Sequence, residues 1–291
     1  MSKQFKKIGL SGTFKDLKND KFIKAILDTL KILNIEILCD ESFVNKNSYL
    51  QEFSSTDKKI LKEAELVISL GGDGTMLRNS KKYGMNGKPI LGINLGTLGF
   101  LTDIQTDDLA TRLTDVLKGD YLLDERSFLE CSLGSKKSKS LALNEIVVHS
   151  GSVAKMIQFS LFIDNSFVYK QKADGVIIFS PTGSTAYSLS GGGPLVDPDL
   201  KLIGIMPMFP HSINTTPILI EDSKEIRIEL DNYKNNKDSE LSFDSQTNIK
   251  LKKSLTITIS KSKHKLSLVH PLDDDFFSRC RNKLGWGKSI T

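Results

Sequence analysis

The sequence has few cysteines and no long hydrophobic run. Only three cysteines occur in 291 residues, Cys39, Cys131 and Cys280, an odd and widely spaced set. Such a set argues against a disulfide framework and indicates a reducing compartment. No CxxC pair is present, which disfavours a zinc or redox site. No segment approaches the roughly 20 apolar residues that span a bilayer or forms a signal-peptide core, so we expect a cytoplasmic protein without membrane contact.

A strong charge of one sign is also absent. The chain carries 40 basic and 35 acidic residues, a net charge of +5. This balance would suit a polyanionic substrate, although a solvated lysine-rich surface gives the same count. No basic block on a single face is apparent, so we expect no nucleic-acid partner. The 39% hydrophobic and 26% charged residues are ordinary for a soluble protein, and the length suffices for two domains.

The first part of the chain alternates between two hydrophobic periods. Strands are predicted over 7–12, 35–39, 65–70 and 89–94. Apolar residues at helical spacing predict helices from Asn19 to Leu33, over 75–84 with Gly84 as the stop, and around 109–117. This alternation predicts an α/β domain with a parallel sheet over residues 1–124.

The hydrophobic pattern of the sequence changes after Asp124. Short strands separated by turn residues are predicted over 126–134, 141–150, 156–164, 167–171, 175–179, 201–206, 225–231, 255–260 and 264–269. They predict a mostly antiparallel, β-rich, sandwich-like domain over 125–271. The remaining residues, 272–291, read as a short helix and tail.

A glycine-rich loop, GGDGT, begins at Gly71 directly after the strand predicted over 65–70. Two readings stay open for it: a tight turn, which Gly and Asp both favour, or a phosphate loop at the start of a helix. It is not the dinucleotide fingerprint GxGxxG. The segment GWGKSI near the end is no Walker A loop either, because Asn282 stands where that motif needs glycine.

Two further signals lie in the second half. The segment 173–196 reads ADGVIIFSPTGSTAYSLSGGGPLV, in which Thr182 or Ser184 could cap a helix and Tyr187 could stack on a base or sugar. An ordinary glycine-rich connection is the alternative. Asn144 and Glu145 form a polar pair inside an apolar strand, and for this pair alone we expect an edge position that faces water.

Taken together, these segments resemble one family. The motifs GGDGTML, NLGTLGFLTDI, LNEIVV, DGVIIFSPTGSTAYSLSGGGPLV, PMFPHSIN and LGW occur in the order found in bacterial NAD kinases. The resemblance covers nearly the whole chain from about residue 65. GGDGT by itself is shared with diacylglycerol-type lipid kinases and, loosely, with phosphofructokinases.

The resemblance implies transfer of the γ-phosphoryl group of ATP to the 2′-hydroxyl of the adenosine ribose of NAD, with Mg²⁺ or another divalent cation accompanying ATP. It implies an α/β domain followed by a β-rich domain, a tail that returns to the first, and a homodimer or homotetramer. Asp73 matches the general base. The positions implied to bind the dinucleotide are Gly72, Gly74, Phe100, Asn144, Glu145, Lys155, Lys172, Asp174, Thr182, Thr185, Ala186, Tyr187, Ser188, Leu189, Ser190 and Gln246. No protein ligand to a metal is implied.

Two positions depart from the family pattern. Lys155 stands where a histidine is common, and Lys172 where members that prefer NAD over NADH often have arginine. Lysine lacks the planar fork of arginine, so the sequence favours NAD only weakly. Two other classes remain open. A lipid or small-alcohol kinase would share GGDGT but leave the 182–190 loop unexplained, and a non-enzymatic dinucleotide-binding regulator would not need Asp73.

Overall fold

The computed structural model describes residues 4–13, 20–45, 47–94, 96, 99–134, 139–152, 155–212, 214–231, 238–251 and 256–287. The chain forms two compact units, one of residues 1–125 with 265–291 and one of residues 126–264. The limits expected from the sequence, 1–124 and 125–271 for the two domains and 272–291 for the tail, stay a prediction. No helix among the described residues is both long and apolar enough to cross a membrane.

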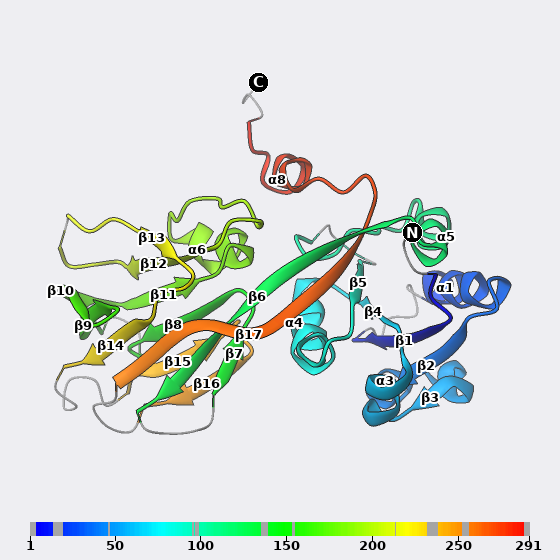
Figure 1. Cartoon of the computed structure of the whole chain (residues 1–291), viewed down its shortest axis with the longest axis horizontal. Coiled ribbons are helices and arrows are strands. Elements are labelled where there is room, and N and C mark those ends of the chain that lie inside the picture. The colour runs from blue at the N-terminus through cyan, green and yellow to red at the C-terminus, as the bar shows by residue number, and fades with distance from the viewer. Residues whose placement is uncertain are drawn as a thin grey trace. The chain divides into compact units, whose positions relative to one another are not determined.

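The first unit is built on a parallel sheet (Figure 1). Its strands lie in the order β5-β4-β1-β2-β3, and the end of β17 pairs in parallel with β5. The strands are β1 (Lys7–Gly12), β2 (Glu36–Asp40), β3 (Ser54–Ser55), β4 (Leu66–Leu70), β5 (Ile90–Ile93) and β17 (Thr256–Pro271). The helices are α1 (Asp20–Ile32), α2 (Glu41–Val44), α3 (Asp57–Glu63), α4 (Asp73–Lys82), α5 (Leu109–Lys118) and α8 (Phe276–Leu284), with short 3₁₀ turns at η2 (Ser48–Phe53) and η3 (Gly84–Asn86).

Helices cover the parallel sheet on both faces, which explains why its strands are apolar throughout. The side chains of Ile8 and Ile68 pack into one core with the buried faces of α1 and α5. On the opposite face, Gly9 lies against Ile60 of α3. Every residue of β4 is buried. A strand buried on both sides reads as a continuous hydrophobic run, as the sequence 66–70 does.

Helix α4 differs from its predicted limits. It begins at Asp73, two residues earlier than expected, with Gly72 as the cap, and it ends at Lys82. Gly84 was predicted as the stop, but the left-handed glycine is Gly87, with φ of 82°. At Gly84 the lack of a side chain is needed for packing, because a Cβ there would overlap the side chain of Leu266. The earlier start places Asp73 in the first turn of the helix.

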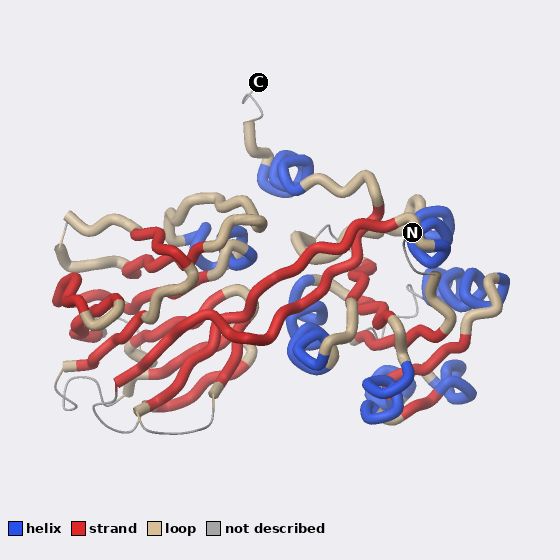
Figure 2. Tube along the Cα trace, in the orientation of Figure 1, coloured by secondary structure: helices blue, strands red, loops and turns tan. Residues whose placement is uncertain are grey.

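The second unit consists mostly of antiparallel strands. In Figure 2 its helical segments, among the described residues, are confined to η4 (Thr182–Thr185) and α6 (Tyr187–Ser190). One sheet has the order β13-β12-β11-β8-β15-β16, and β10, β9, β14 and the start of β17 pair in another. The strands are β6 (Tyr121–Leu133), β7 (Ser140–Ala142), β8 (Glu145–His149), β9 (Ile157–Ile163), β10 (Ser166–Ala173), β11 (Gly175–Phe179), β12 (Leu202–Met208), β13 (Ile218–Glu221), β14 (Ile226–Leu230), β15 (Glu240–Phe243) and β16 (Thr247–Lys250).

The two sheets of this unit share one hydrophobic core. Ile146 of β8 and Val176 and Ile178 of β11 contribute to it from one sheet, and Phe159 of β9 and Ile228 of β14 from the other. The predicted fold class, a parallel α/β domain followed by a sandwich-like antiparallel domain, is therefore confirmed. The alternate residues of β11, Ile177 and Phe179, pack on the other face with Val196 and Met206.

Several strand predictions need correction. The strands predicted over 255–260 and 264–269 are one strand, β17, which continues through the polar residues between them. Its buried side shifts there, from the odd-numbered Ile257 and Ile259 to the even-numbered Ser262 and Leu266. The strand predicted over 141–150 is broken into β7 and β8 at Leu143 and Asn144. No sequence pattern predicted β3, β13, β15, β16, α2 or α3. These elements are short, and contacts with neighbouring elements stabilise them more than their own sequences do.

Candidate active site

The GGDGT loop lies at the point where the strand order of the parallel sheet reverses. From β1 the chain proceeds outward to β2 and β3, whereas β4 and β5 lie on the other side of β1. In open α/β sheets the crevice beyond the carboxyl ends of strands at such a point is the usual ligand site. Gly71 follows the last residue of β4, and Thr75 Oγ1 lies 2.7 Å from the Oγ1 of Thr13, just beyond β1.

The glycines of this loop leave space next to Asp73. Gly71 has a φ of 154° and a Cβ there would overlap Thr75. A Cβ at Gly72 or Gly74 would meet no described atom within 4 Å. A side chain at either position would therefore project into open space at the start of α4. Backbone N–H groups and the positive end of the helix dipole make such a place favourable for a phosphate.

The Asp73 carboxylate is held by two backbone amides. The N–H of Phe100 donates to Oδ2 at 3.0 Å, and the N–H of Leu101 donates to Oδ1 at 3.0 Å. Gly99 permits this approach, because a Cβ there would overlap Asp73 Oδ1. Phe100 was implied to contact the dinucleotide, and here its backbone orients the acid.

A lysine from the end of the chain also contacts this acid. Lys283 of α8 donates to Asp73 Oδ2 at 3.1 Å, and its ammonium lies 4.3 Å from the centroid of the Phe100 ring. The sequence reasoning missed Lys283. The signal available was weak: a lysine next to the LGW motif, 210 positions after the acid.

A buried polar network continues from the loop along the carboxyl edge of the sheet. Asn79 of α4 accepts from Ser11 at 3.0 Å and donates to Ser69 at 2.8 Å. Ser11 also donates to Asp40 at 3.2 Å. Burial acts to raise the pKa of Asp40, but hydrogen bonds from Lys82, Ser42 and Tyr83 outweigh it and hold that pKa well below its usual range. Asp40 is thus a fixed anion that orients its neighbours.

In the second unit, the segment 180–190 leads from β11 across the outer face of its sheet. The predicted capping by Thr182 or Ser184 is wrong, because neither η4 nor α6 has a side-chain cap. Thr182 Oγ1 instead accepts from Arg126 at 3.3 Å, and Ser184 Oγ bonds both the carbonyl and the N–H of Val196. These hydroxyls connect the loop to β6 and to the segment around Val196.

The rest of this loop is held by its own backbone. Ser188 Oγ donates to the carbonyl of Gly183 at 3.0 Å, and Thr185 Oγ1 donates to that of Thr182 at 3.3 Å. Tyr187 is 42% exposed. The loop positions implied to bind the dinucleotide are contiguous in the fold: Thr182, Thr185, Ala186, Tyr187, Ser188, Leu189 and Ser190.

Asn144 and Glu145 are not at a water-facing edge, contrary to the expectation for this pair. Both are buried, and β8 lies between β11 and β15. The carboxylate of Asp244 accepts from three successive amides, those of Leu143 (2.9 Å), Asn144 (2.8 Å) and Glu145 (3.1 Å). The side-chain oxygen of Asn144 has no hydrogen-bond partner among the described residues. A buried amide oxygen without a partner can accept a hydrogen bond from a donor group of a bound ligand.

A cavity of about 430 Å³ brings Asp174 and Tyr187 together. Its other lining residues are Val147, His149, Ser150, Met208, Ser242, Ser245 and Asn248. Its lining combines one carboxylate, three serine hydroxyls, an imidazole and an amide with an aromatic ring and two apolar side chains. Polar groups of this kind can orient a small polar ligand. Gln246 is exposed and follows Ser245 in the turn between β15 and β16.

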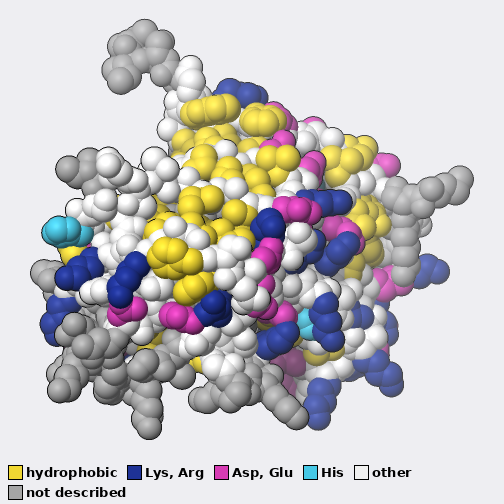
Figure 3. All heavy atoms as spheres, turned by 60° about the vertical axis from the view of Figure 1, so that its left-hand side comes forward, with side chains coloured by type: hydrophobic (Ala, Val, Ile, Leu, Met, Phe, Trp, Pro, Cys, Tyr) yellow, Lys and Arg dark blue, Asp and Glu magenta, His cyan; other side chains and the backbone are white. Residues whose placement is uncertain are grey.

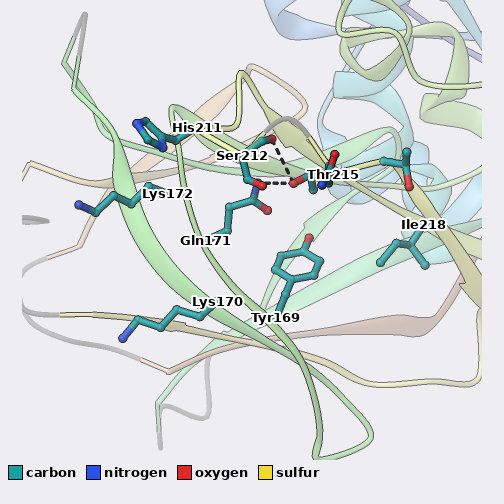
Figure 4. Close-up of a pocket in the computed structure, with 10 residues that line it drawn as sticks. Tyr169, Lys170, Gln171, Lys172, His211, Ser212, Thr215 and Ile218 are labelled. Carbon is teal, nitrogen blue, oxygen red and sulfur yellow. Dashed lines mark hydrogen bonds between the residues drawn. The ribbon is translucent and has the colours of Figure 1, made fainter.

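The two basic positions lie apart from that lining. Lys172 lines a second cavity of about 420 Å³, shown in Figure 4 with Lys170, His211 and Thr215. In that view Gln171 donates to Thr215, whose hydroxyl donates to the carbonyl of Ser212. Lys155 is exposed and pairs with Asp238 at 3.2 Å.

Charges of both signs are mixed on the surface. On the face shown in Figure 3, lysine and arginine side chains lie among aspartate and glutamate side chains rather than in a field of their own.

Sequence comparisons match both parts of the chain. Models of the ATP-NAD kinase N-terminal domain and of the ATP-NAD kinase C-terminal domain match residues 23–121 and 143–271. An NAD kinase from Marinobacter nauticus is 40% identical over 99% of this chain and 98% of its own length. The chain belongs to the NAD kinase family. An NAD kinase from Teredinibacter turnerae is 38% identical over 97% of each chain.

Solved structures of NAD kinase relatives share the fold. A crystal structure of yeast NADH kinase complexed with NADH has a TM-score of 0.85 and 24% identity, covering 99% of this chain and 89% of that one. A crystal structure of an NAD kinase from Archaeoglobus fulgidus in complex with ATP has a TM-score of 0.74 and 26% identity, covering 96% and 97%. The family membership confirms the resemblance that the motifs indicated.

Proposed function

We propose that this member of the NAD kinase family transfers the γ-phosphoryl group of ATP to the 2′-hydroxyl of the adenosine ribose of NAD, with Asp73 as general base. The observation that carries the proposal is the position of Asp73: in the first turn of α4, at the reversal of strand order, beside two glycines that leave open space. Phosphoryl transfer depends mainly on positioning, and on neutralising charge. The open space beside Asp73 leaves room for the phosphates, and the N-terminus of α4 favours their negative charge.

The hydrogen bonds of Asp73 leave it able to take a proton. Each carboxylate oxygen has two acceptor sites, and Oδ1 accepts one described hydrogen bond, from Leu101. In the proposed step the ribose oxygen bonds to the γ-phosphorus while the bond from that phosphorus to the bridging oxygen breaks. ADP leaves with the electron pair, and the hydroxyl proton passes to Oδ1. A carboxylate can accept it as bonding develops.

The residues of the second unit are proposed to bind the dinucleotide. The buried side-chain oxygen of Asn144, which has no partner among the described residues, supports this role. The cavity lined by Asp174 and Tyr187 also supports it. The loop positions Thr182, Thr185, Ala186, Ser188, Leu189 and Ser190 are proposed to wrap it, with Glu145, Lys155, Lys172 and Gln246 as further contacts. In the first unit, Gly72 and Gly74 are proposed to admit phosphate beside Asp73.

Mg²⁺ is proposed to enter with ATP, and when bound it would supply positive charge that offsets the charge of the phosphates. Of the described residues, Asp103, His270 and Asp274 place possible ligand atoms within 4.8 Å of one another. Arg279 pairs with both of these carboxylates, so the cluster already contains a cation and does not suit another. No protein ligand for Mg²⁺ is therefore proposed.

Three finer points belong to the same proposal. We propose NAD rather than NADH as the preferred acceptor, on the weak ground of a basic residue at Lys172. We propose a homodimer or homotetramer that acts in the cytoplasm, without nucleic-acid or membrane partners. The three cysteines are buried and unpaired, which suits a reducing compartment.

The test is a coupled assay with ATP and Mg²⁺ and one acceptor at a time: NAD, NADH or a diacylglycerol. NADP formation from NAD supports the proposal. Phosphorylation of the lipid alone would assign the lipid-kinase alternative, and binding of NAD without turnover would assign the regulator. Folded protein that makes no NADP with any common phosphoryl donor would refute the central claim.

A further inference from the structure

The C-terminal helix places a cation directly on the proposed base. Lys283 Nζ lies 3.1 Å from Asp73 Oδ2, and the side chains of both residues are about 30% exposed. The same ammonium lies 4.3 Å from the ring centroid of Phe100. Because the N–H of Phe100 also donates to Oδ2, one residue supplies a hydrogen bond to the acid and a π-face to the lysine.

The position of this lysine is fixed by the anchoring of α8. Asp275 caps the helix by accepting from the amides of Phe277 (3.1 Å) and Ser278 (2.9 Å). The buried guanidinium of Arg279 donates to Asp103 at 2.9 Å and pairs with Asp274. Beyond the helix, Trp286 stacks on Phe277 with ring centroids 6.4 Å apart. Arg279 therefore ties the helix to Asp103, while the cap and the Trp286 ring hold the ends of the helix in place.

We propose that Lys283 is a positioning residue for phosphoryl transfer, acting through Asp73. The inference rests on the proposed function of Asp73. The lysine ammonium holds Oδ2 against the Phe100 amide, so that Oδ1 stays directed to the hydroxyl. It also offsets the repulsion between the Asp73 carboxylate and the phosphates of ATP, since opposite charges at this distance attract strongly where water is partly excluded.

A purely structural role predicts different results. Partly exposed ion pairs typically contribute about 0 to 1 kcal/mol to stability. Loss of Lys283 should therefore leave the melting temperature almost unchanged. A charge-assisted hydrogen bond on a reacting group affects the rate more strongly, and we expect kcat to fall about 10- to 100-fold.

The experiment compares Lys283→Ala, Lys283→Arg and Lys283→Cys. The Ala and Cys variants should lose kcat with the KM for NAD within about threefold of wild type, and the Arg variant should keep most of the activity. Treating the Cys variant with 2-bromoethylamine creates a thioether side chain that ends in an ammonium at the position of the lysine nitrogen. Since the three native cysteines are buried, the introduced thiol should react selectively and the rate should recover.

Two controls accompany these variants. Arg281→Ala removes another exposed cation of α8, and Lys224→Cys removes a surface lysine paired with Asp164 at 2.8 Å; both should retain wild-type kcat. An active wild type with an equally active Lys283→Ala overturns the inference, as does a folded Cys variant that stays slow after aminoethylation. A wild type that makes no NADP is instead the failure of the proposed function.

Discussion

Asp73 combines a constrained side chain with unobstructed surroundings. Two amides and a lysine fix its orientation, and two flanking glycines leave space for phosphate. A turn former would need neither feature, since Gly and Asp favour turns through their own backbone preferences. The arrangement supports the phosphate-loop reading of GGDGT over the tight-turn reading that the sequence left open.

The first prediction concerns Asp73→Asn. The amide keeps the shape and most hydrogen bonds but cannot accept a proton, so kcat should fall by about 10²- to 10⁴-fold. NAD affinity measured by calorimetry should be nearly unchanged, because most proposed dinucleotide contacts lie elsewhere. Near-normal turnover of the folded variant would show that Asp73 is not the base.

Tyr187 is predicted to act in binding. It is half exposed and lines the same cavity as Asp174. Tyr187→Ala should raise the KM for NAD by about 5- to 150-fold with little change in kcat, since a stacking ring is worth about 1–3 kcal/mol per base. Tyr187→Phe keeps the ring and serves as the control. A large fall in kcat at constant KM would point to a role in the transition state.

Among the elements, the turn between β15 and β16 sets the shape of the start of β8. Asp244 and Ser245 both have left-handed backbone angles, with φ of 52° and 53°. This conformation aims the Asp244 carboxylate at three amides of the neighbouring strand. The Asp244 carboxylate thereby takes up the backbone amides of Leu143 and Asn144, where the ladder between β7 and β8 is interrupted.

Asp244→Asn tests this turn. Asparagine tolerates the left-handed conformation, so the backbone is not strained, but its NH₂ group opposes one of the donated amides. We expect a loss of about 1–3 kcal/mol in unfolding free energy and a higher KM for NAD, with the KM for ATP unchanged. The matched control is Asp164→Asn, an exposed aspartate that also has positive φ and accepts from a backbone amide. Equal effects of the two substitutions would contradict the assignment.

Local patterns predicted most of the elements and the fold class. Strands β1 and β11 were predicted with their observed limits, and helices α1 and α5 nearly so, because each encodes its own hydrophobic period. The break at Asn144 could not be predicted, since it depends on Asp244, 100 positions away. The contact of Lys283 with Asp73 joins residues 210 positions apart and was missed for the same reason.

At the scale of the whole first unit, a buried charged cluster ties α8 to the sheet. His270 of β17 is buried, with Nδ1 2.6 Å from Asp103 and 3.7 Å from Asp274, and Nε2 3.4 Å from Asp124. Arg279 is the other cation that faces the cluster. Burial acts to lower the pKa of His270, but Asp103, Asp124 and Asp274 outweigh it and raise the pKa to about 9.

The raised pKa predicts a loss of stability in alkali. Histidine in the unfolded chain titrates near 6.5, so the stabilisation is complete below that pH and is lost as the pH rises through about 9. The full contribution of His270 to the free energy of unfolding is roughly 3 kcal/mol. Chemical denaturation between pH 6 and 10 should show this fall in the wild type, whereas His270→Gln should be less stable at pH 6 and lack this contribution to the slope. An unchanged slope in that variant would argue against a charged His270.

The first unit is interrupted in sequence by the second. Its chain leaves at Glu125 and returns at Lys265. A ribosome therefore delivers all of the second unit before it delivers the partner strand of β5 and the helix that carries Lys283. During synthesis the GGDGT loop exists without its lysine until Lys283 emerges. Any chain terminated before Lys283 would thus lack the contact that we propose for catalysis, even where the second unit had folded.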